Sequence, residues 1–313
     1  MITGHGGNIY QLAELLGCRT DEIIDMSSNI NPLGPIPGLI PVLKKNLQSI
    51  RVLPEADAAG MVQAVAGRYG IPHRQIAAGT GTTQLIYALP HALKMKNALI
   101  IGPTYSDYAD ACKTYGVKST YLFSKPADLF TPDITAIHQF STRFDTIFIC
   151  NPNNPTGGLL GRKDIETLCR ICSHANVIVD ESYLPFVDGW EEESIMRSDL
   201  PNAFVLHSLS KIFAVPGLRI GLIFFPHAFR ENITRALQPW SVSGLAQVAA
   251  RYIMENRENA VRFIEKSCRY ITAEKNKFLN RFEGVEGIRF FPSRVGYLLA
   301  RLSGRDSGTR LAD

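Results

Sequence analysis

The 313-residue sequence has no uninterrupted apolar run of membrane-spanning length and no long block of like charges. A membrane helix needs about 20 consecutive apolar residues, so we expect no contact with a membrane. The net charge is only +4, without the basic block that binds nucleic acid, so we expect no nucleic-acid partner. Residues 1–8 lack the basic and apolar stretches of a secretory signal, which predicts a cytoplasmic protein.

Cysteine is scarce as well. The six cysteines are scattered and lie mostly in apolar contexts, which is typical of reduced core thiols rather than of a disulfide framework. Cys169 and Cys172 form one C-x-x-C pair near His174, but a zinc site needs a second pair. We therefore interpret them as two thiols on one face of a helix over 164–174, and we expect no metal site.

Short apolar runs alternate with amphipathic stretches through most of the chain. The runs that predict strands are 75–78, 98–101, 119–123, 146–150, 177–180, 203–207 and 220–225. Uninterrupted Val, Ile, Leu and Phe indicate a sheet that is covered on both faces, and the intervening helical stretches suit crossover connections. The pattern predicts a three-layer α/β fold with a mainly parallel central sheet.

The pattern changes after Pro239. Long helices are predicted over 244–255 and 257–282, and strands over 288–291 and 297–301. A chain of this length has room for a second, smaller domain. We therefore expect an N-terminal arm (1–37) that contributes to the small domain and the active site, a large domain (38–240) and a small α+β domain (241–313).

Polar and aromatic groups follow the predicted strands, at the rim where open α/β sheets bind ligands. They are Gly79-Thr-Gly-Thr-Thr83, Tyr105, Asn151-Pro-Asn-Asn-Pro-Thr-Gly157, Asp180, Tyr183 and Ser208-Leu-Ser-Lys211. The glycine-rich turn precedes a predicted helix, so Gly81, Thr82 and Thr83 are candidates for a phosphate cradle. Arg219 is a further candidate for the phosphate. The turn lacks the G-K-[ST] and G-x-G-x-x-G patterns of nucleotide-binding loops.

The remaining groups suit a flat, charged heteroaromatic ring. Asp180 ends a hydrophobic strand, where a buried carboxylate needs a cationic partner such as a protonated ring nitrogen. Asn154 and Tyr183 can donate to a ring oxygen, and Tyr105 either stacks on the ring or is a buried core tyrosine. Lys211 follows a buried strand in a Ser-x-Ser turn, and lysine is the side chain that forms Schiff bases.

The segment Ser208-x-Ser-Lys211-x-Phe-x-x-x-Gly-x-Arg219-x-Gly221 resembles the attachment signature of class I and II aminotransferases, which use pyridoxal 5′-phosphate (PLP). Asn151-Pro-x-Asn154-Pro-Thr-Gly157 and Asp180-Glu-x-Tyr183 resemble ring-binding motifs of the same family, in the same order. The resemblance implies the type I fold of PLP enzymes, with catalytic roles for Lys211, Asp180 and Tyr183. Lys211 would carry the cofactor and Asp180 would pair with its pyridine nitrogen.

The same resemblance implies the other cofactor contacts. Asn154 and Tyr183 would bond the 3′-oxygen of PLP, and Tyr105 would stack on its ring. The residues that it implies at the phosphate are Gly81, Thr82, Thr83, Ser208, Ser210 and Arg219.

Peripheral segments resemble a narrower family, the L-threonine O-3-phosphate decarboxylases. They are His5-Gly-Gly-Asn8, Ser28-Asn-Ile-Asn-Pro-Leu-Gly34 and Pro239-Trp-Ser-Val242. This resemblance implies that His5, Gly6, Asn29 and Asn154 contact a small phosphorylated amino acid. It implies decarboxylation of O-phospho-L-threonine to (R)-1-amino-2-propanol O-2-phosphate for cobalamin biosynthesis, and it implies a homodimer.

Two alternatives stay open. Histidinol-phosphate aminotransferases of histidine biosynthesis share the Lys211, Arg219 and Asn154 motifs and also take a phosphorylated amine. An inactive, truncated PLP-fold protein is the other, because members of the family continue with two substrate-gripping arginines whose context Arg305 and Arg310 do not match. We therefore expect the small domain to be C-terminally incomplete.

A departure within the chain supports the second alternative. Leu53 stands where the family usually has a tyrosine that reaches the cofactor phosphate of the neighbouring subunit.

Overall fold

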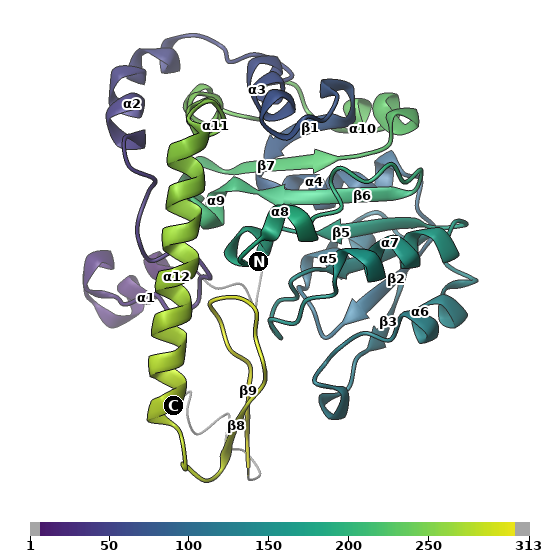
Figure 1. Cartoon of the computed structure of the whole chain (residues 1–313). Coiled ribbons are helices and arrows are strands. Elements are labelled where there is room, and N and C mark those ends of the chain that lie inside the picture. The colour runs from purple at the N-terminus through teal and green to yellow at the C-terminus, as the bar shows by residue number, and fades with distance from the viewer. Residues whose placement is uncertain (1–6, 304–313) are drawn as a thin grey trace.

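The computed structural model describes residues 7–303, and a mixed sheet lies at its centre (Figure 1). The seven-stranded sheet has the strand order β1–β7–β6–β5–β4–β2–β3. Its strands are β1 (Ile76–Thr80), β2 (Asn97–Gly102), β3 (Lys118–Phe123), β4 (Thr146–Cys150), β5 (Asn176–Asp180), β6 (Ala203–Ser208) and β7 (Ile220–Phe224). A separate two-stranded sheet pairs β8 (Ile288–Phe290) with β9 (Ala300–Leu302).

The central sheet is mainly parallel, as predicted. From β6 through β5, β4 and β2 to β3, every neighbouring pair is parallel. β7 lies antiparallel to both β1 and β6, which makes β1 and β6 parallel to each other. The carboxyl ends of β1, β4, β5 and β6 therefore open on the same edge of the sheet, where ligands bind in such folds.

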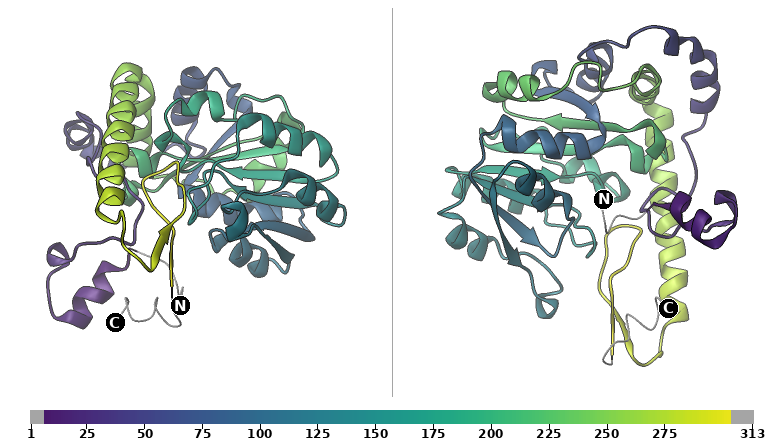
Figure 2. Two further views of the ribbon diagram at one scale, coloured as in Figure 1. Left: turned by 60° about the horizontal axis from the view of Figure 1, so that its bottom comes forward. Right: turned by 180° about the vertical axis from the view of Figure 1, so that it is seen from behind.

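Helices cover both faces of the sheet and complete the predicted three layers (Figure 2). One face carries α4 (Gly81–Ala92), α5 (Asp107–Thr114) and α10 (Arg230–Ala236). The helices with buried side chains in the core on the other face include α3 (Ala59–Tyr69), α6 (Ile134–Ser141), α7 (Arg162–Ile171), α8 (Trp190–Glu193), α9 (Leu209–Ile212) and α11 (Gly244–Glu255).

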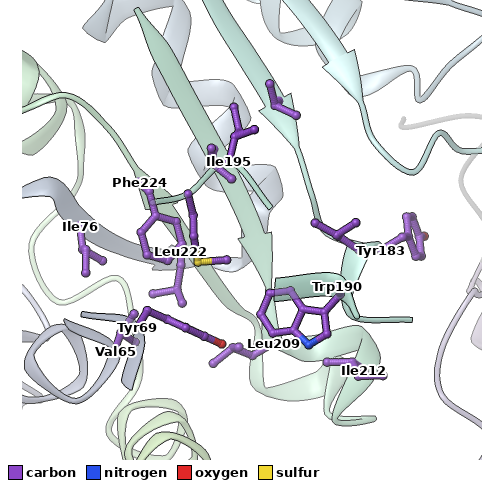
Figure 3. Close-up of a cluster of buried hydrophobic side chains, with 14 of the residues drawn as sticks. Val65, Tyr69, Ile76, Tyr183, Trp190, Ile195, Leu209, Ile212, Leu222 and Phe224 are labelled. Carbon is purple, nitrogen blue, oxygen red and sulfur yellow. The ribbon is translucent and has the colours of Figure 1, made fainter. Parts of the chain in front are cut away.

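Side chains along a strand alternate between the two cores. In β4, Ile147 and Ile149 belong to one core, whereas Phe148 and Cys150 belong to the other. This is the period-two alternation of a strand that is buried on both faces. Figure 3 shows part of the first core, in which Tyr69 and Trp190 pack edge to face at 6.0 Å between ring centroids. Tyr183 belongs to the same core and also lines the cleft described below.

The remaining helices flank the sheet at one side (Figure 1). They are α1 (Ile9–Leu16), α2 (Leu39–Lys45) and the long α12 (Arg257–Arg281). The N-terminal segment is anchored by Asn31, whose Nδ2 donates to the carbonyl oxygen of Ile212 and to Ser267 Oγ, both at 2.7 Å. This buried amide ties residues distant in sequence to the turn that carries Lys211. None of the helices within residues 7–303 has the length and apolar content needed to cross a bilayer.

The structure confirms the predicted strands and long helices with small shifts at their ends. The largest difference is the strand predicted over 297–301, because only 300–302 pair as β9. The Tyr297 hydroxyl instead donates to the carbonyl oxygen of Asn153 at 3.1 Å.

The cysteines are free thiols, and all but Cys18 are buried, as predicted. Cys169 lies in α7 and Cys172 is its C-terminal cap. Burial raises the pKa of Cys169 to about 12, which is typical of an unreactive core thiol.

Candidate active site

The predicted cofactor residues meet in one cleft of about 570 Å³ at the carboxyl edge of the central sheet. The cleft is lined by each described residue of the predicted site, namely Asn29, Gly81, Thr82, Thr83, Tyr105, Asn154, Asp180, Tyr183, Ser208, Ser210, Lys211 and Arg219. His5 and Gly6 lie outside the described residues. The fold thus brings together groups from six separate parts of the chain.

One end of the cleft is formed by the start of α4. The first N–H groups of a helix have no acceptor within the helix, so they attract an anion. Gly81 has a φ of +81°, and a Cβ at this position would stand 2.6 Å from Arg219 Nη2. The missing side chain therefore lets the Arg219 guanidinium lie against the turn. Arg219 itself has a left-handed φ of +53°, which is uncommon outside glycine.

β7 passes directly behind this turn. Gly221 pairs with Gly79 on one side and with Ser208 on the other. A Cβ on Gly221 would lie 2.4 Å from the carbonyl carbon of Gly81 and 2.5 Å from Thr82 N. Because these atoms are backbone, the close approach of β7 to the turn requires glycine.

Ser208 and Ser210 are buried next to the same turn. Ser210 Oγ accepts from Ile220 N at 3.1 Å and donates to the carbonyl oxygen of Ile220 at 3.3 Å. This hydroxyl joins α9 to β7 in the structure, and its contact with a phosphate stays a prediction.

Asp180 ends β5 and is only 5% exposed. Its Oδ2 accepts from the Tyr108 hydroxyl and its Oδ1 accepts from Ser182 N, both at 2.9 Å. Each carboxyl oxygen therefore has a donor, which fixes the rotation of the group. A buried carboxylate that lines a cleft suits a cationic ligand group.

Tyr105 stands at the wall of the cleft, edge-on to Tyr108 at 5.8 Å between ring centroids. Its hydroxyl is hydrogen-bonded to Asp107 and Thr83. Burial, and then the hydrogen bond to Asp107, raise the pKa of Tyr105, so that the hydroxyl stays protonated. The ring is thus held in one orientation, which suits stacking on a flat ligand.

Lys211 lies in α9, with its Nζ 4.6 Å from the centroid of the Tyr183 ring. An ammonium group at this distance from an aromatic face makes a cation–π contact. The carbonyl oxygen of Lys211 accepts from Asn31 N at 3.1 Å. Because this bond ties the N-terminal segment to the lysine turn, Asn29 reaches the lining of the cleft.

The loop that carries Asn154 is braced at its base. Asn151 Nδ2 donates to the carbonyl oxygen of Leu160 at 2.9 Å, and Leu160 N donates back to Asn151 Oδ1 at 2.8 Å. Asn153 Nδ2 donates to the carbonyl oxygen of Pro103 at 2.8 Å. The motif asparagines other than Asn154 therefore shape the loop, and Asn154 lines the cleft.

Sequence reasoning missed Tyr108 and Cys150, which also line the cleft. Tyr105 lies just before α5, and Tyr108 lies in the first turn of that helix. The signal in the sequence was limited to a second aromatic residue three positions after Tyr105.

Sequence reasoning also missed Glu181, which is buried beside Asp180. It accepts from the Ser194 hydroxyl and from Ile195 N at 3.0 Å. Burial raises the pKa of Glu181 to about 7. The carboxyl group fastens the turn after β5 to the segment after α8.

These groups fit PLP. One end of the cleft offers hydroxyls, a guanidinium and free helix N–H groups to a phosphate, around a turn where a Cβ at Gly81 would collide with Arg219. The other end offers the buried Asp180 carboxyl to a pyridine nitrogen. An amine on Lys211 and an aromatic face on Tyr105 lie on the walls of the same cleft.

Comparisons with known proteins identify the family of the chain. The family model for aminotransferase class I and II matches residues 21–312. The chain is 30% identical to a threonine-phosphate decarboxylase from Salmonella typhimurium over 307 residues, which is 97% of this chain and 83% of that protein. It is 26% identical to a histidinol-phosphate aminotransferase from Akkermansia muciniphila over 301 residues, 95% of this chain and 81% of that protein.

A solved structure shows the same fold. The L-threonine-O-3-phosphate decarboxylase from Porphyromonas gingivalis superimposes with a TM-score of 0.80 at 28% sequence identity, covering 90% of this chain and 83% of that one. The chain therefore belongs to the aminotransferase class I and II family and is an enzyme that depends on PLP.

Proposed function

We propose that this enzyme decarboxylates O-phospho-L-threonine to (R)-1-amino-2-propanol O-2-phosphate for cobalamin biosynthesis. The observation that carries the proposal is the position of the N-terminal segment. Ser28 and Asn29 line the cofactor cleft, and Asn31 ties this segment to the lysine turn. It is the segment in which the sequence resembles threonine-phosphate decarboxylases, and the similarity to the Salmonella decarboxylase supports the assignment.

The cofactor contacts are part of the proposal. Lys211 would attach PLP, Asp180 would hold the pyridine nitrogen, and Asn154 and Tyr183 would hold the 3′-oxygen. Tyr105 would stack on the ring. The groups proposed at the phosphate are Gly81, Thr82, Thr83, Ser208, Ser210 and Arg219, which line the cleft.

Substrate contacts follow from the same segment. We assign the anionic groups of the substrate to Asn29 and Asn154, which line the cleft, together with His5 and Gly6. Backbone amides and a histidine flanked by glycine suit a phosphate, since they donate hydrogen bonds without steric obstruction.

When bound, PLP supplies a sink for the electron pair of the breaking bond between Cα and the carboxylate. The residues of this chain do the rest. Lys211 would hold the cofactor before the substrate binds, and its free Nζ would then return a proton to Cα after carbon dioxide has left. A C–H bond replaces the C–C bond, so no oxo acid is consumed.

The test is to incubate the chain with PLP and O-phospho-L-threonine, without any oxo acid, and to measure carbon dioxide. We expect carbon dioxide and aminopropanol phosphate in equal amounts, and neither with Lys211→Ala. A reaction that requires 2-oxoglutarate would contradict the proposal.

The alternative is a histidinol-phosphate aminotransferase, and the similarity to the Akkermansia enzyme keeps it open. The two are separated by adding L-glutamate to the PLP-loaded protein. An aminotransferase converts its yellow cofactor to the colourless amine form, whereas a decarboxylase leaves the absorbance unchanged.

The inactive alternative is tested in the same samples. A protein that binds PLP but leaves both phosphorylated amines unchanged would support it.

A further inference from the structure

Tyr108 and Asp180 form a buried pair at the floor of the cofactor cleft. The tyrosine is 1% exposed and the aspartate 5%, and the hydroxyl donates to Asp180 Oδ2 at 2.9 Å. Burial, and then the charge of Asp180, raise the pKa of Tyr108 well above its usual value. The hydroxyl therefore stays protonated and serves Asp180 as a hydrogen-bond donor.

The single proton of this hydroxyl is committed to Asp180. The neighbouring group is Cys150, which is in hydrogen-bonding contact with the Tyr108 hydroxyl and donates from Sγ to the carbonyl oxygen of Pro152 at 3.3 Å. Burial raises the pKa of Cys150 to about 12, so the thiol is neutral and does not compete as an anion. Asp180 is thus the acceptor that the tyrosine serves.

The protein core, rather than a ligand, holds the Tyr108 ring in place. The ring is stacked on Phe148 of β4, with 5.2 Å between centroids and 18° between planes. On another side it meets Tyr105 edge-on at 5.8 Å. A ring packed on two sides cannot swing its hydroxyl away from Asp180 without disturbing the core.

We propose that Tyr108 is a positioning residue for the cofactor, whose hydroxyl holds the Asp180 carboxyl in the rotation that receives the PLP ring nitrogen. The second oxygen is held by Ser182 N, so Tyr108 supplies the side-chain half of a two-point grip. The inference goes beyond the decarboxylation, and it rests only on the proposed pairing of Asp180 with the ring nitrogen.

The test compares two ligands on the apoprotein. One is PLP, and the other is its analogue in which a C–H group replaces the ring nitrogen. Kd is measured for both by fluorescence titration of wild type and of Tyr108→Phe, which keeps the stacked ring and loses the hydroxyl. We expect wild type to prefer PLP, and Tyr108→Phe to reduce that preference about tenfold, as for loss of a hydrogen bond to a charged group.

The matched control is Tyr69→Phe. Tyr69 is also a buried tyrosine, but it packs against Trp190 and His207 in the core on the opposite face of the sheet. We expect this variant to keep the wild-type preference for PLP over the analogue.

Each outcome of the titrations either supports or overturns the proposed role of Tyr108. Unchanged binding of the analogue by Tyr108→Phe, with weaker binding of PLP, supports the proposal and shows that the site is folded. The proposal is overturned if Tyr108→Phe prefers PLP over the analogue as strongly as wild type does, even if it binds both ligands more weakly. Equal binding of the two ligands by wild type overturns the pairing of Asp180 and the inference with it. Because no turnover is measured, failure of the decarboxylase proposal would appear separately, in the carbon dioxide assay.

Discussion

At the scale of single residues, Lys211 has two roles in the proposed reaction, because its amine would both attach the cofactor and return the proton. We expect Lys211→Arg to show no Schiff-base absorbance band with PLP and to release carbon dioxide at least about 10³-fold more slowly. Arginine keeps a positive charge beside Tyr183 but cannot form a Schiff base. The control is Lys163→Arg, at an exposed position of α7, which should match wild type in both measurements.

His207 makes the stability of the fold depend on pH. It is 1% exposed, its ring stacks on Trp190 at 5.4 Å between centroids, and within the described chain its Nδ1 has no hydrogen-bond partner. Burial lowers the pKa of His207 to about 4, against a smaller opposing effect of Glu191. The unfolded chain therefore takes up a proton before the folded chain does. The stability that neutral His207 contributes is complete above pH 6.5 and is lost as the pH falls toward 4.

We expect His207→Phe to remove this loss, because phenylalanine can keep the stacking on Trp190 and has no proton to gain. At about 1.4 kcal/mol per pH unit, wild type should lose about 3 kcal/mol more than the variant between pH 7 and pH 4. Urea unfolding at the two pH values measures this difference. The control is His73→Gln at an exposed position, which should lose as much stability as wild type between the two pH values. If His207→Phe also loses as much stability as wild type, the assignment to His207 is refuted.

At the scale of elements, the contact between β7 and the start of α4 shapes the phosphate end of the cleft. We expect Gly221→Ala to destabilise the fold by about 1–3 kcal/mol and to weaken PLP binding, because the new Cβ would collide with the backbone of Gly81 and Thr82. Denaturant unfolding and PLP titration measure the two effects. Gly217→Ala is the control, since a Cβ there meets nothing within 4 Å. Equal behaviour of the two variants would contradict the collision.

The elements themselves were largely predictable. β4 was predicted with the bounds that the structure has, because its uninterrupted apolar run is buried on both faces. The ends of most other elements shifted by up to three residues, since pairing at a strand end depends on a neighbour that the local sequence does not contain. β1, for example, runs on to Thr80 because β7 pairs with it through Ile220.

At the scale of the whole molecule, the exposed apolar segment around Leu53 bears on assembly. Leu53 is 75% exposed and does not line the cleft, and its neighbours Ile50 and Val52 are 72% and 68% exposed. An exposed apolar segment is typical of an interface. A homodimer stays a prediction here, which light scattering of the purified chain would test.

If a dimer forms, a tyrosine in place of Leu53 should reach the neighbouring cofactor phosphate. We expect Leu53→Tyr to tighten PLP binding about tenfold, as for a hydrogen bond to a charged group. The control is Ile50→Tyr, at an equally exposed position nearby. An unchanged Kd for Leu53→Tyr in a dimeric protein would contradict this role for the position.

The reactive residues were readable in the sequence, because Lys211, Asp180 and Asn154 each stand in a motif only a few residues long. Their surroundings were not. Tyr108 meets Asp180 across 72 residues, and Asn31 meets Ile212 across 181, so neither contact leaves a local pattern. Such contacts arise only when Tyr108 of α5 meets the end of β5 and when the N-terminal segment crosses to the lysine turn. Short motifs identify the reactive residues from the sequence alone, whereas contacts between residues far apart in the chain form only when the chain folds.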